Sequence, residues 1–337
     1  MSEPLKPSAP PFQRILETAS AFQASRVLLT AVELDLFTLL DVAPRASAEA
    51  APVINADPRG LDRLMNALAA LGFLVKREGR FANAPEASRF LVRGKPGYIA
   101  SLMHWVHLWE TWGTLTAAVR RGGPVDRAAV GERGEAWLEA FIAAMHWRGT
   151  QHAPGVVGSL DLTGVARVLD VGGGSGAYAM AFVRAKAGLR ATVFDLPGVL
   201  PLTRRYVAEA NLTGAIEFAA GDYGTDPFGP GFDLVFLSAI VHSNSPDENR
   251  HLLRRCAAAL APGGQMVIQD FLIDEARSGP VFPALFALNM LVGTLAGDTY
   301  TETEIRTWMA EASIEAISRR DTPFGTSLLV GRRGRSA

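Results

Sequence analysis

The spacing of apolar residues changes along the chain and divides it into two parts. Up to about residue 100 the apolar positions recur at helical intervals, beginning with Phe12, Ile15 and Leu16. From about residue 160 short apolar runs alternate with amphipathic stretches. We therefore expect a helical N-terminal domain, residues 12–100, followed by an α/β domain, residues 101–335.

The N-terminal pattern predicts a long apolar first helix and further helices that end in a hairpin. Asp57 is a natural N-cap, Pro58 suits the first helical position, and Gly72 suits the C-terminal stop. The next segment, "FLVKREGRFANA", predicts two strands that turn at Glu78-Gly79. Helices followed by a hairpin resemble a winged helix, so a DNA-binding regulator has to be considered.

The charge of this N-terminal part disfavours DNA. Residues 1–100 hold twelve Lys and Arg against ten Asp and Glu, whereas a DNA reader usually carries a clear basic surplus. The first helix has more apolar surface than one small domain needs. We therefore expect the N-terminal domain to pair two copies of the chain as a homodimer and to bind no nucleic acid.

The second part predicts a parallel sheet with helices on both faces. Its expected strands are "ARVLDVGG", "ATVFDL", "AIEFAAGD", "FDLVFLSAIVH" and "GQMVIQDFLI", and helical segments lie between them. Capping boxes at Ser245–Glu248 and Thr301–Glu304 predict the starts of two helices. The C-terminal segment predicts two more strands around a Pro-Phe-Gly-Thr turn.

Composition favours a soluble protein of the cytoplasm. Hydrophobic residues make up 48% of the chain, the formal net charge is -1, and the single cysteine, Cys256, excludes an internal disulfide. The start of the chain is polar and proline-rich, unlike a signal peptide. The most apolar stretch, residues 284–297, is interrupted by Asn289 and too short for a bilayer span of ~20 residues, so no membrane contact is expected.

A glycine-rich segment, "VLDVGGGSGAY", follows the first strand of the second part and precedes a helix. Gly172, Gly174 and Ala177 fit the G-x-G-x-x-A pattern that lets a nucleotide approach the backbone. Asp195 ends the next strand, where a carboxylate accepts ribose hydroxyls. Both features indicate an adenosine-type cofactor and suit NAD and S-adenosylmethionine (SAM) equally.

Three further features resemble the class I SAM-dependent methyltransferases. "GDY" places Asp222 where it could accept from the adenine amino group, "LAPGGQMVI" puts a turn before the fifth strand, and a hairpin closes the sheet. With "FDLPGV", "LNMLVGT" and the helical N-terminal domain, the chain from about residue 12 to 333 resembles the dimeric small-molecule O-methyltransferases, such as the caffeate and acetylserotonin enzymes. The resemblance implies a Rossmann-like SAM-binding sheet behind a winged-helix-like dimerisation domain.

The resemblance also implies the roles of individual residues. His242 matches the family's general base, and Asp270 matches the acid that orients it. The usual His-Asp-Trp is His242-Ser243-Asn244 here, and Thr299 stands where the family carries a second acid. Further implied cofactor contacts are Leu196, Tyr223, Ser238 and Arg148, and implied substrate contacts are Phe141, Met145 and Asn289.

These observations lead us to expect a SAM-dependent O-methyltransferase that acts on a hydroxyl of a small aromatic metabolite. A SAM-binding relative that catalyses hydroxylation or pericyclic chemistry, and an NAD-dependent oxidoreductase, stay open as alternatives. His242 could also be a structural strand cap. His104 and His107 have metal-ligand spacing but no third ligand nearby, so no metal is expected, and the Trp105, Trp109 and Trp112 stripe is expected in the core.

Overall fold

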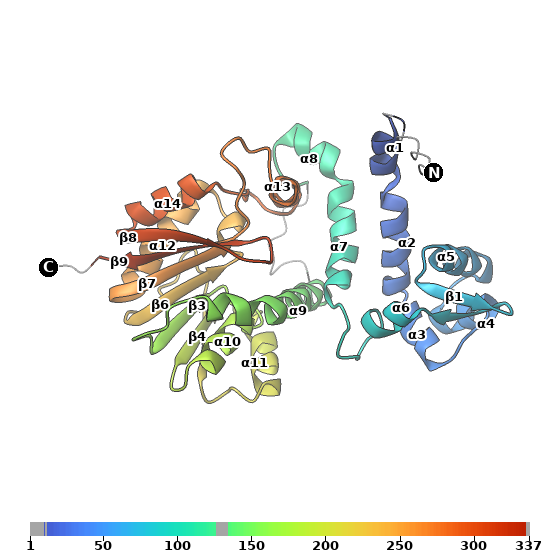
Figure 1. Ribbon diagram of the computed structural model, residues 1–337, viewed down its shortest axis with the longest axis horizontal. Helices are drawn as coiled ribbons and strands as arrows, with labels where there is room; N and C mark the ends of the chain where they lie inside the picture. Colours follow the sequence, from blue (N-terminus) through green and yellow to red (C-terminus); the bar gives the residue numbers. More distant parts are fainter. Residues whose placement is uncertain (1–9, 11, 126–133, 335–337) are drawn as a thin grey trace, which may run out of the picture. The chain divides into compact units, whose positions relative to one another are not determined.

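The chain divides after Val106 into an N-terminal and a C-terminal unit, and helix α7 (Ser101–Gly113) spans the division (Figure 1). The computed structural model describes residue 10 and residues 12–125 and 134–334. The two units are described separately below.

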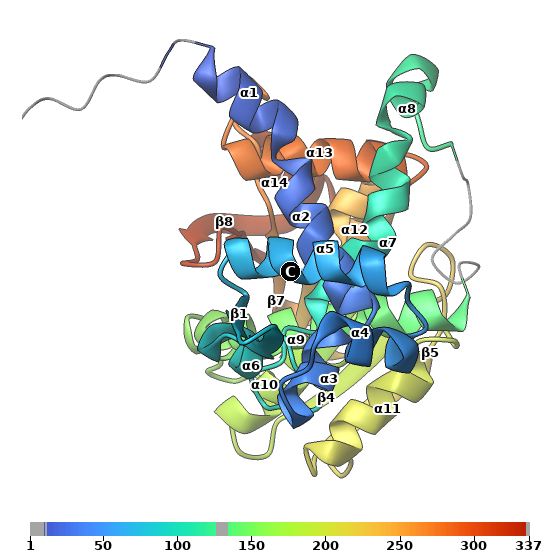
Figure 2. The same ribbon diagram turned by 90° about the vertical axis from the view of Figure 1, so that its right-hand side faces the viewer.

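The N-terminal unit is mainly helical. Its elements are α1 (Gln13–Ser20), α2 (Phe22–Glu33), α3 (Leu36–Val42), α4 (Ser47–Ala50), a 3-10 turn (Ala51–Ile54), α5 (Pro58–Ala70), β1 (Leu74–Arg77), β2 (Arg80–Asn83) and α6 (Pro85–Phe90). The prediction of one long first helix was wrong. α1 and α2 run almost end to end (Figure 2), but Asp35 adopts a left-handed φ of 52° and turns the chain into α3.

The local signals of this unit are confirmed. The Asp57 side chain accepts from the backbone N–H groups of Arg59 and Gly60, and Pro58 begins α5. Glu78 and Gly79 both have positive φ, 50° and 75°, as a two-residue hairpin turn requires. The helix, cap and hairpin thus agree with the sequence.

Apolar side chains of α1 are not covered within the chain. Phe12 just before the helix and Ile15 and Leu16 in it are 58%, 69% and 56% exposed, and α1 buries no residue. The core of the unit lies elsewhere, around Phe37 and Met65. An apolar helix of this kind needs a further surface to cover it.

The C-terminal unit is built on a seven-stranded sheet of order β5-β4-β3-β6-β7-β9-β8, in which β9 runs antiparallel to both neighbours. Its strands are β3 (Arg167–Val171), β4 (Arg190–Asp195), β5 (Ile216–Ala220), β6 (Phe232–Ser238), β7 (Leu260–Asp270), β8 (Ile314–Asp321) and β9 (Ser327–Arg333). Its helices are α8 (Leu115–Arg121), α9 (Glu135–Gly158), α10 (Ala177–Ala185), α11 (Leu200–Glu209), α12 (Pro246–Ala259), α13 (Val281–Gly293) and α14 (Glu302–Glu311).

Two apolar layers hold the helices against the sheet (Figure 1). On one face Val156 of α9, Phe182 of α10 and Val207 of α11 pack on the strands. On the other face Cys256 of α12 and Trp308 of α14 do so, and burial raises the pKa of the Cys256 thiol. The predicted Rossmann-like fold is therefore confirmed, and both predicted capping boxes begin their helices, α12 and α14.

Strand order reverses at β3, which pairs with β4 on one side and β6 on the other. Helices that connect parallel strands leave a crevice beyond the carboxyl ends at such a reversal, and ligands bind there. The prediction that β6 extends to His242 was wrong. β6 ends at Ser238, Ala239 turns with φ 58°, and His242 lies in a 3-10 turn, Val241–Ser243.

Two other observations bear on the sequence predictions. Trp105 is 54% exposed, so the expectation that the tryptophan stripe is core was wrong at this position. No helix among residues 12–125 and 134–334 is long and apolar enough to cross a membrane.

Candidate active site

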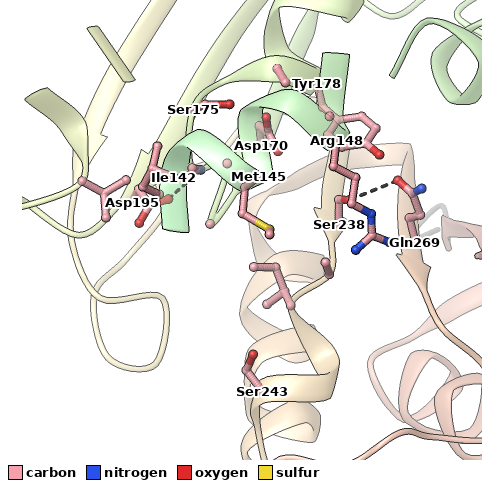
Figure 3. A pocket seen from close by; sticks show the side chains of 18 of the residues that line it. Ile142, Met145, Arg148, Asp170, Ser175, Tyr178, Asp195, Ser238, Ser243 and Gln269 are labelled. Atoms are coloured by element: carbon pink, nitrogen blue, oxygen red, sulfur yellow. Dashed lines mark hydrogen bonds between the residues drawn. The ribbon is translucent and has the colours of Figure 1, made fainter. Parts of the chain in front are cut away.

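A cavity lies beyond the carboxyl ends of β3, β4, β6 and β7 (Figure 3). Ten of the residues singled out in the sequence line it: Phe141, Met145, Arg148, Gly172, Gly174, Asp195, Leu196, Tyr223, Ser238 and Asp270. Three others, Asp222, His242 and Asn289, are not part of this lining.

The glycine loop forms one wall of the cavity because only glycine fits its backbone. Gly172 has φ +62°, and a Cβ atom there would lie 2.4 Å from Cδ1 of Ile240. Gly174 and Gly176 have φ +55° and +76°. The loop therefore brings bare backbone to the cavity, as a nucleotide site requires.

Asp195 is held at the end of β4 with room for further hydrogen bonds. One carboxylate oxygen accepts from the Gly174 N–H at 2.7 Å, and the other accepts from the Leu196 N–H at 2.8 Å. Each oxygen keeps a lone pair for a ligand hydroxyl. Burial raises the pKa of Asp195 to about 6, although both backbone N–H groups act in the opposite direction.

A second carboxylate, Asp170, lies beneath the glycine loop and is 1% exposed. It accepts from the Ala179 N–H at 3.1 Å, and a Cβ on Gly173 would lie 2.8 Å from its carboxylate. Burial raises the pKa of Asp170 to about 7, and the nearby charge of Asp195 adds to the rise.

Polar side chains from β6, β7 and the residue before β9 also line the cavity, namely Ser238, Gln269 and Thr326. The Ser238 hydroxyl donates to the Gln269 amide oxygen at 3.0 Å, and the Gln269 amide nitrogen donates to the Thr326 hydroxyl at 3.0 Å. The Arg148 guanidinium lies 4.6 Å from the centre of the Phe271 ring. Gln269 was missed, and the signal for it was its pairing with Ser238 across two parallel strand ends.

His242 and Asp270 form a buried pair at the edge of this cavity. His242 Nδ1 lies 2.7 Å from Asp270 Oδ1, and the His242 backbone N–H donates to Asp270 Oδ2 at 3.3 Å. The Phe271 N–H also donates to Asp270 Oδ1, at 2.8 Å. The Asp270 carboxylate accepts from the two backbone N–H groups and from the imidazole. Nδ1 of His242 therefore carries the hydrogen, and Nε2 keeps its lone pair.

Aromatic rings surround His242. The Phe286 ring meets the imidazole edge-on, with 4.8 Å between ring centres. Phe271 and Phe282 extend the cluster, with ring centres 4.7 Å apart from each other and 4.9 and 5.7 Å from that of Phe286. The imidazole of His242 therefore lies beside an apolar aromatic cluster.

Two other predicted positions are engaged locally. Asp222 is exposed, and its Oδ1 accepts from the Gly224 N–H at 2.7 Å, so the carboxylate caps its own turn. Thr299, where the sequence resemblance implies a second acid, is fully buried and donates to the Pro283 carbonyl at 3.2 Å. The adjacent carboxylate, Asp298, pairs with Arg277 at 3.1 Å.

Asn289 has a partner inside the C-terminal unit. The Trp112 indole N–H donates to Asn289 Oδ1 at 2.8 Å. Indole can only donate, so this contact fixes which end of the amide meets it. Among the residues that the structure describes, no cluster of three or more His, Cys, Asp or Glu side chains could hold a metal ion.

Three features lie together at one edge of the sheet: the glycine loop, the Asp195 carboxylate with free lone pairs, and the His242–Asp270 pair. This combination is typical of an enzyme that uses a nucleotide cofactor. An O-methyltransferase family model matches residues 112–314, and a model of the associated dimerisation domain matches residues 16–93. The chain belongs to this O-methyltransferase family.

Relatives extend this result over nearly the whole chain. A 3-hydroxy-5-methyl-1-naphthoate 3-O-methyltransferase of Streptomyces sahachiroi is 35% identical over 90% of this chain and 89% of the relative. The tetracenomycin polyketide synthesis 8-O-methyl transferase of Streptomyces glaucescens is 35% identical over 95% and 96%. The crystal structure of human N-acetylserotonin methyltransferase in complex with SAM matches with a TM-score of 0.86 at 28% identity, over 98% of this chain and 100% of that one.

The protein is therefore a SAM-dependent O-methyltransferase of small molecules, and its dimerisation domain indicates a homodimer. The residues present fit the cofactor. Asp195 has a free lone pair on each oxygen, the loop at Gly172 leaves no room for a Cβ, and the Arg148 guanidinium lines the same cavity.

Proposed function

We propose that the enzyme methylates a hydroxyl of an aromatic small molecule, with His242 as general base and Asp270 as the residue that orients it. The observation that carries this proposal is the 2.7 Å contact between Nδ1 and the Asp270 carboxylate. It leaves Nε2 of the imidazole free to accept a proton. The same contact stabilises the imidazolium that results.

The cofactor, when bound, supplies a methyl group on a sulfonium, which is a good leaving group. Asp195 would accept hydrogen bonds from the ribose hydroxyls, and Arg148 would pair with the carboxylate of the amino-acid portion. His242 Nε2 would remove the hydroxyl proton of the acceptor as the oxygen–methyl bond forms and the methyl–sulfur bond breaks, which leaves a neutral thioether. The larger task of the chain is to align these groups, since holding two reactants in line removes much of the barrier.

The rings beside the proposed base support an aromatic acceptor. The Phe286 ring lies beside the imidazole, and Phe271 and Phe282 pack with Phe286 into one apolar aromatic cluster. A planar acceptor that packs on them places its hydroxyl near Nε2. The relatives named for a naphthoate and for tetracenomycin polyketide synthesis support the same class.

Asn289 supplies a polar contact to such an acceptor. Its Oδ1 already accepts from Trp112, so the amide NH₂ remains to donate to an acceptor oxygen. Phe141 and Met145 line the cofactor cavity, and we expect them to contact the acceptor as well.

One observation favours a second function. Thr299 stands in place of an acid that would assist the base, and it bonds to Pro283 and to no group of the imidazole. A SAM-binding relative that catalyses hydroxylation or a pericyclic reaction could dispense with that acid.

A product assay separates the two functions. The purified protein is incubated with SAM labelled in its methyl group and with 3-hydroxy-2-naphthoate, other hydroxynaphthoates and hydroxyanthraquinones. We expect label in the O-methyl product and none with the matched compounds whose hydroxyl is already methylated. A product that lacks the label but differs in ring oxidation or connectivity would support the second function instead.

A further inference from the structure

We propose that Asn249 is a positioning residue for the general base, because it fixes the peptide unit from which His242 is held against Asp270. This inference rests on the proposed role of His242. It concerns a residue on α12 that does not line the cofactor cavity.

The turn that carries His242 has little support of its own. β6 has ended three residues earlier, and the 3-10 turn Val241–Ser243 is one of the shortest helical elements in the described part of the chain. A three-residue turn closes few internal hydrogen bonds, so its orientation depends on contacts from outside.

Asn249 supplies one of these contacts from the first part of α12. Its side chain is fully buried, and its amide nitrogen donates to the Val241 carbonyl at 2.8 Å. The peptide unit between Val241 and His242 has its N–H on the other side, and this N–H donates to Asp270 Oδ2 at 3.3 Å. One peptide plane is therefore held at both ends, by Asn249 through its C=O and by Asp270 through its N–H.

This arrangement ties the imidazole geometry to Asn249. Rotation of the peptide plane would weaken the longer of the two contacts, the one from the His242 N–H to Asp270. The Nδ1 contact to the same carboxylate would then lose its alignment, because both bonds share one acceptor group. A displacement of this size at a reacting group is enough to lower a rate.

A second amide extends the network to the cofactor cavity. Asn249 Oδ1 accepts from the Asn244 side chain at 3.2 Å, and Asn244 Oδ1 accepts from the Tyr223 hydroxyl at 3.1 Å. Tyr223 lines the cavity. Asn244 is also held through its backbone, because its carbonyl accepts from the Tyr300 hydroxyl at 2.5 Å. Asn244 and Asn249 thus connect a wall of the cofactor site to the turn of the base.

The position of Asn244 in the sequence also bears on this network. Asn244 is the third residue of the His242-Ser243-Asn244 segment, where the sequence resemblance leads us to expect a tryptophan. A tryptophan cannot accept from Tyr223 and cannot bond to Asn249 through an amide. The two asparagines therefore act together as a polar support for the turn Val241–Ser243.

The test compares two substitutions that each remove one buried amide. Asn249→Leu removes the 2.8 Å bond to the Val241 carbonyl. The control, Gln265→Leu in the middle of β7, removes a 2.8 Å bond from a buried amide to the Asp161 carbonyl. Each is measured for thermal stability, for SAH affinity by calorimetry, and for kcat on 3-hydroxy-2-naphthoate per SAH-binding site. If that compound is not methylated, the hydroxynaphthoate found to be methylated in the product assay is used.

Both variants should lose stability, and both should keep the SAH affinity of the wild type. Only Asn249→Leu should lower kcat, by roughly 5- to 50-fold, the order expected when one well-placed hydrogen bond is lost. In a His242→Gln background the Asn249→Leu change should lower kcat no further. Asn249→Asp, which keeps an acceptor for Asn244 but loses the donor, should behave like Asn249→Leu and serves if the leucine variant does not fold.

Wild-type kcat in the Asn249 variants would overturn the inference, and so would an equal loss in the His242→Gln background. A wild-type kcat for His242→Gln itself would instead overturn the proposed base and this inference with it. The two failures are therefore distinguishable.

Discussion

Nδ1 of His242 lies 2.7 Å from Oδ1 of Asp270, although 28 positions separate the two residues in the chain. The pair is buried, with His242 8% and Asp270 2% exposed. Two neighbouring backbone N–H groups also point at the carboxylate. This arrangement selects the tautomer with a free Nε2, which is the form that a proton acceptor needs.

The first prediction concerns Asp270→Asn. An amide can present its NH₂ group to Nδ1, which would then become the acceptor and leave the hydrogen on Nε2. We expect kcat on a hydroxynaphthoate to fall by about 10- to 100-fold, less than for His242→Gln, because the imidazole is still present. Steady-state kinetics measure the effect, and a fall larger than that of His242→Gln would contradict the orienting role.

The second prediction concerns cofactor binding by Asp195. Asp195→Ala should weaken SAH binding by ~1–3 kcal/mol, since two ribose hydroxyls lose their acceptor. Calorimetry measures this. Asp247→Ala on α12, which removes an exposed carboxylate outside the cavity, is the control and should bind SAH as the wild type does.

Affinity for SAH should also depend on pH through the same group. The pKa of Asp195 is raised to about 6 by burial, so protonation at lower pH removes the charged acceptor. Wild-type affinity should therefore be constant above about pH 7 and fall as the pH drops through 6. The Asp195→Asn variant should lack this fall, and a fall of equal size in the variant would assign it to another group.

The third prediction concerns stability and Asp170. Its pKa is raised to about 7 in the folded chain, because burial disfavours the charged form. A carboxyl group with a raised folded-state pKa supports the fold most below its unfolded pKa, and this support is lost as the pH rises through 7. Asp170→Asn keeps an acceptor for the Ala179 N–H and should raise Tm relative to wild type more at pH 8 than at pH 5. Thermal melts at both values measure the difference, and an equal shift at both would contradict the assignment.

The fourth prediction concerns the dimer. Ile15 in α1 is 69% exposed within the chain, and we expect the partner subunit to cover it. Ile15→Glu should shift light scattering at low micromolar concentration from twice the 36.0 kDa chain mass toward a single chain. Val42→Glu in α3 changes a residue that is 79% exposed and should leave the dimer intact. A wild-type dimer for Ile15→Glu would place the interface elsewhere.

Much of the fold could be predicted from the sequence because its signals are local. The glycine loop, the capping boxes and the Glu78-Gly79 turn are each set by residues within a few positions of one another. The break at Asp35 was not predictable in this way. An aspartate tolerates a left-handed φ but does not require it, and the apolar periodicity continues through it.

The sequence could predict the position of a site residue only where that residue directly ends a strand. Asp195 follows from the end of its strand, whereas the exposed Asp222 accepts from the Gly224 N–H, a contact that the sequence leaves open. The aromatic cluster needed tertiary structure. Phe282 and Phe286 lie four apart on α13, but Phe271 joins them from the loop after β7.

The most direct test of His242 as general base is the turnover of His242→Gln on a hydroxynaphthoate at saturating SAM. Glutamine keeps a polar side chain of similar size but cannot take up a proton. We expect SAH affinity to stay at the wild-type value while kcat falls by ~10²–10⁴, because the positioned proton acceptor is lost. Turnover near the wild-type rate would contradict the role of His242 as general base, because alignment of the reactants alone would then drive the transfer.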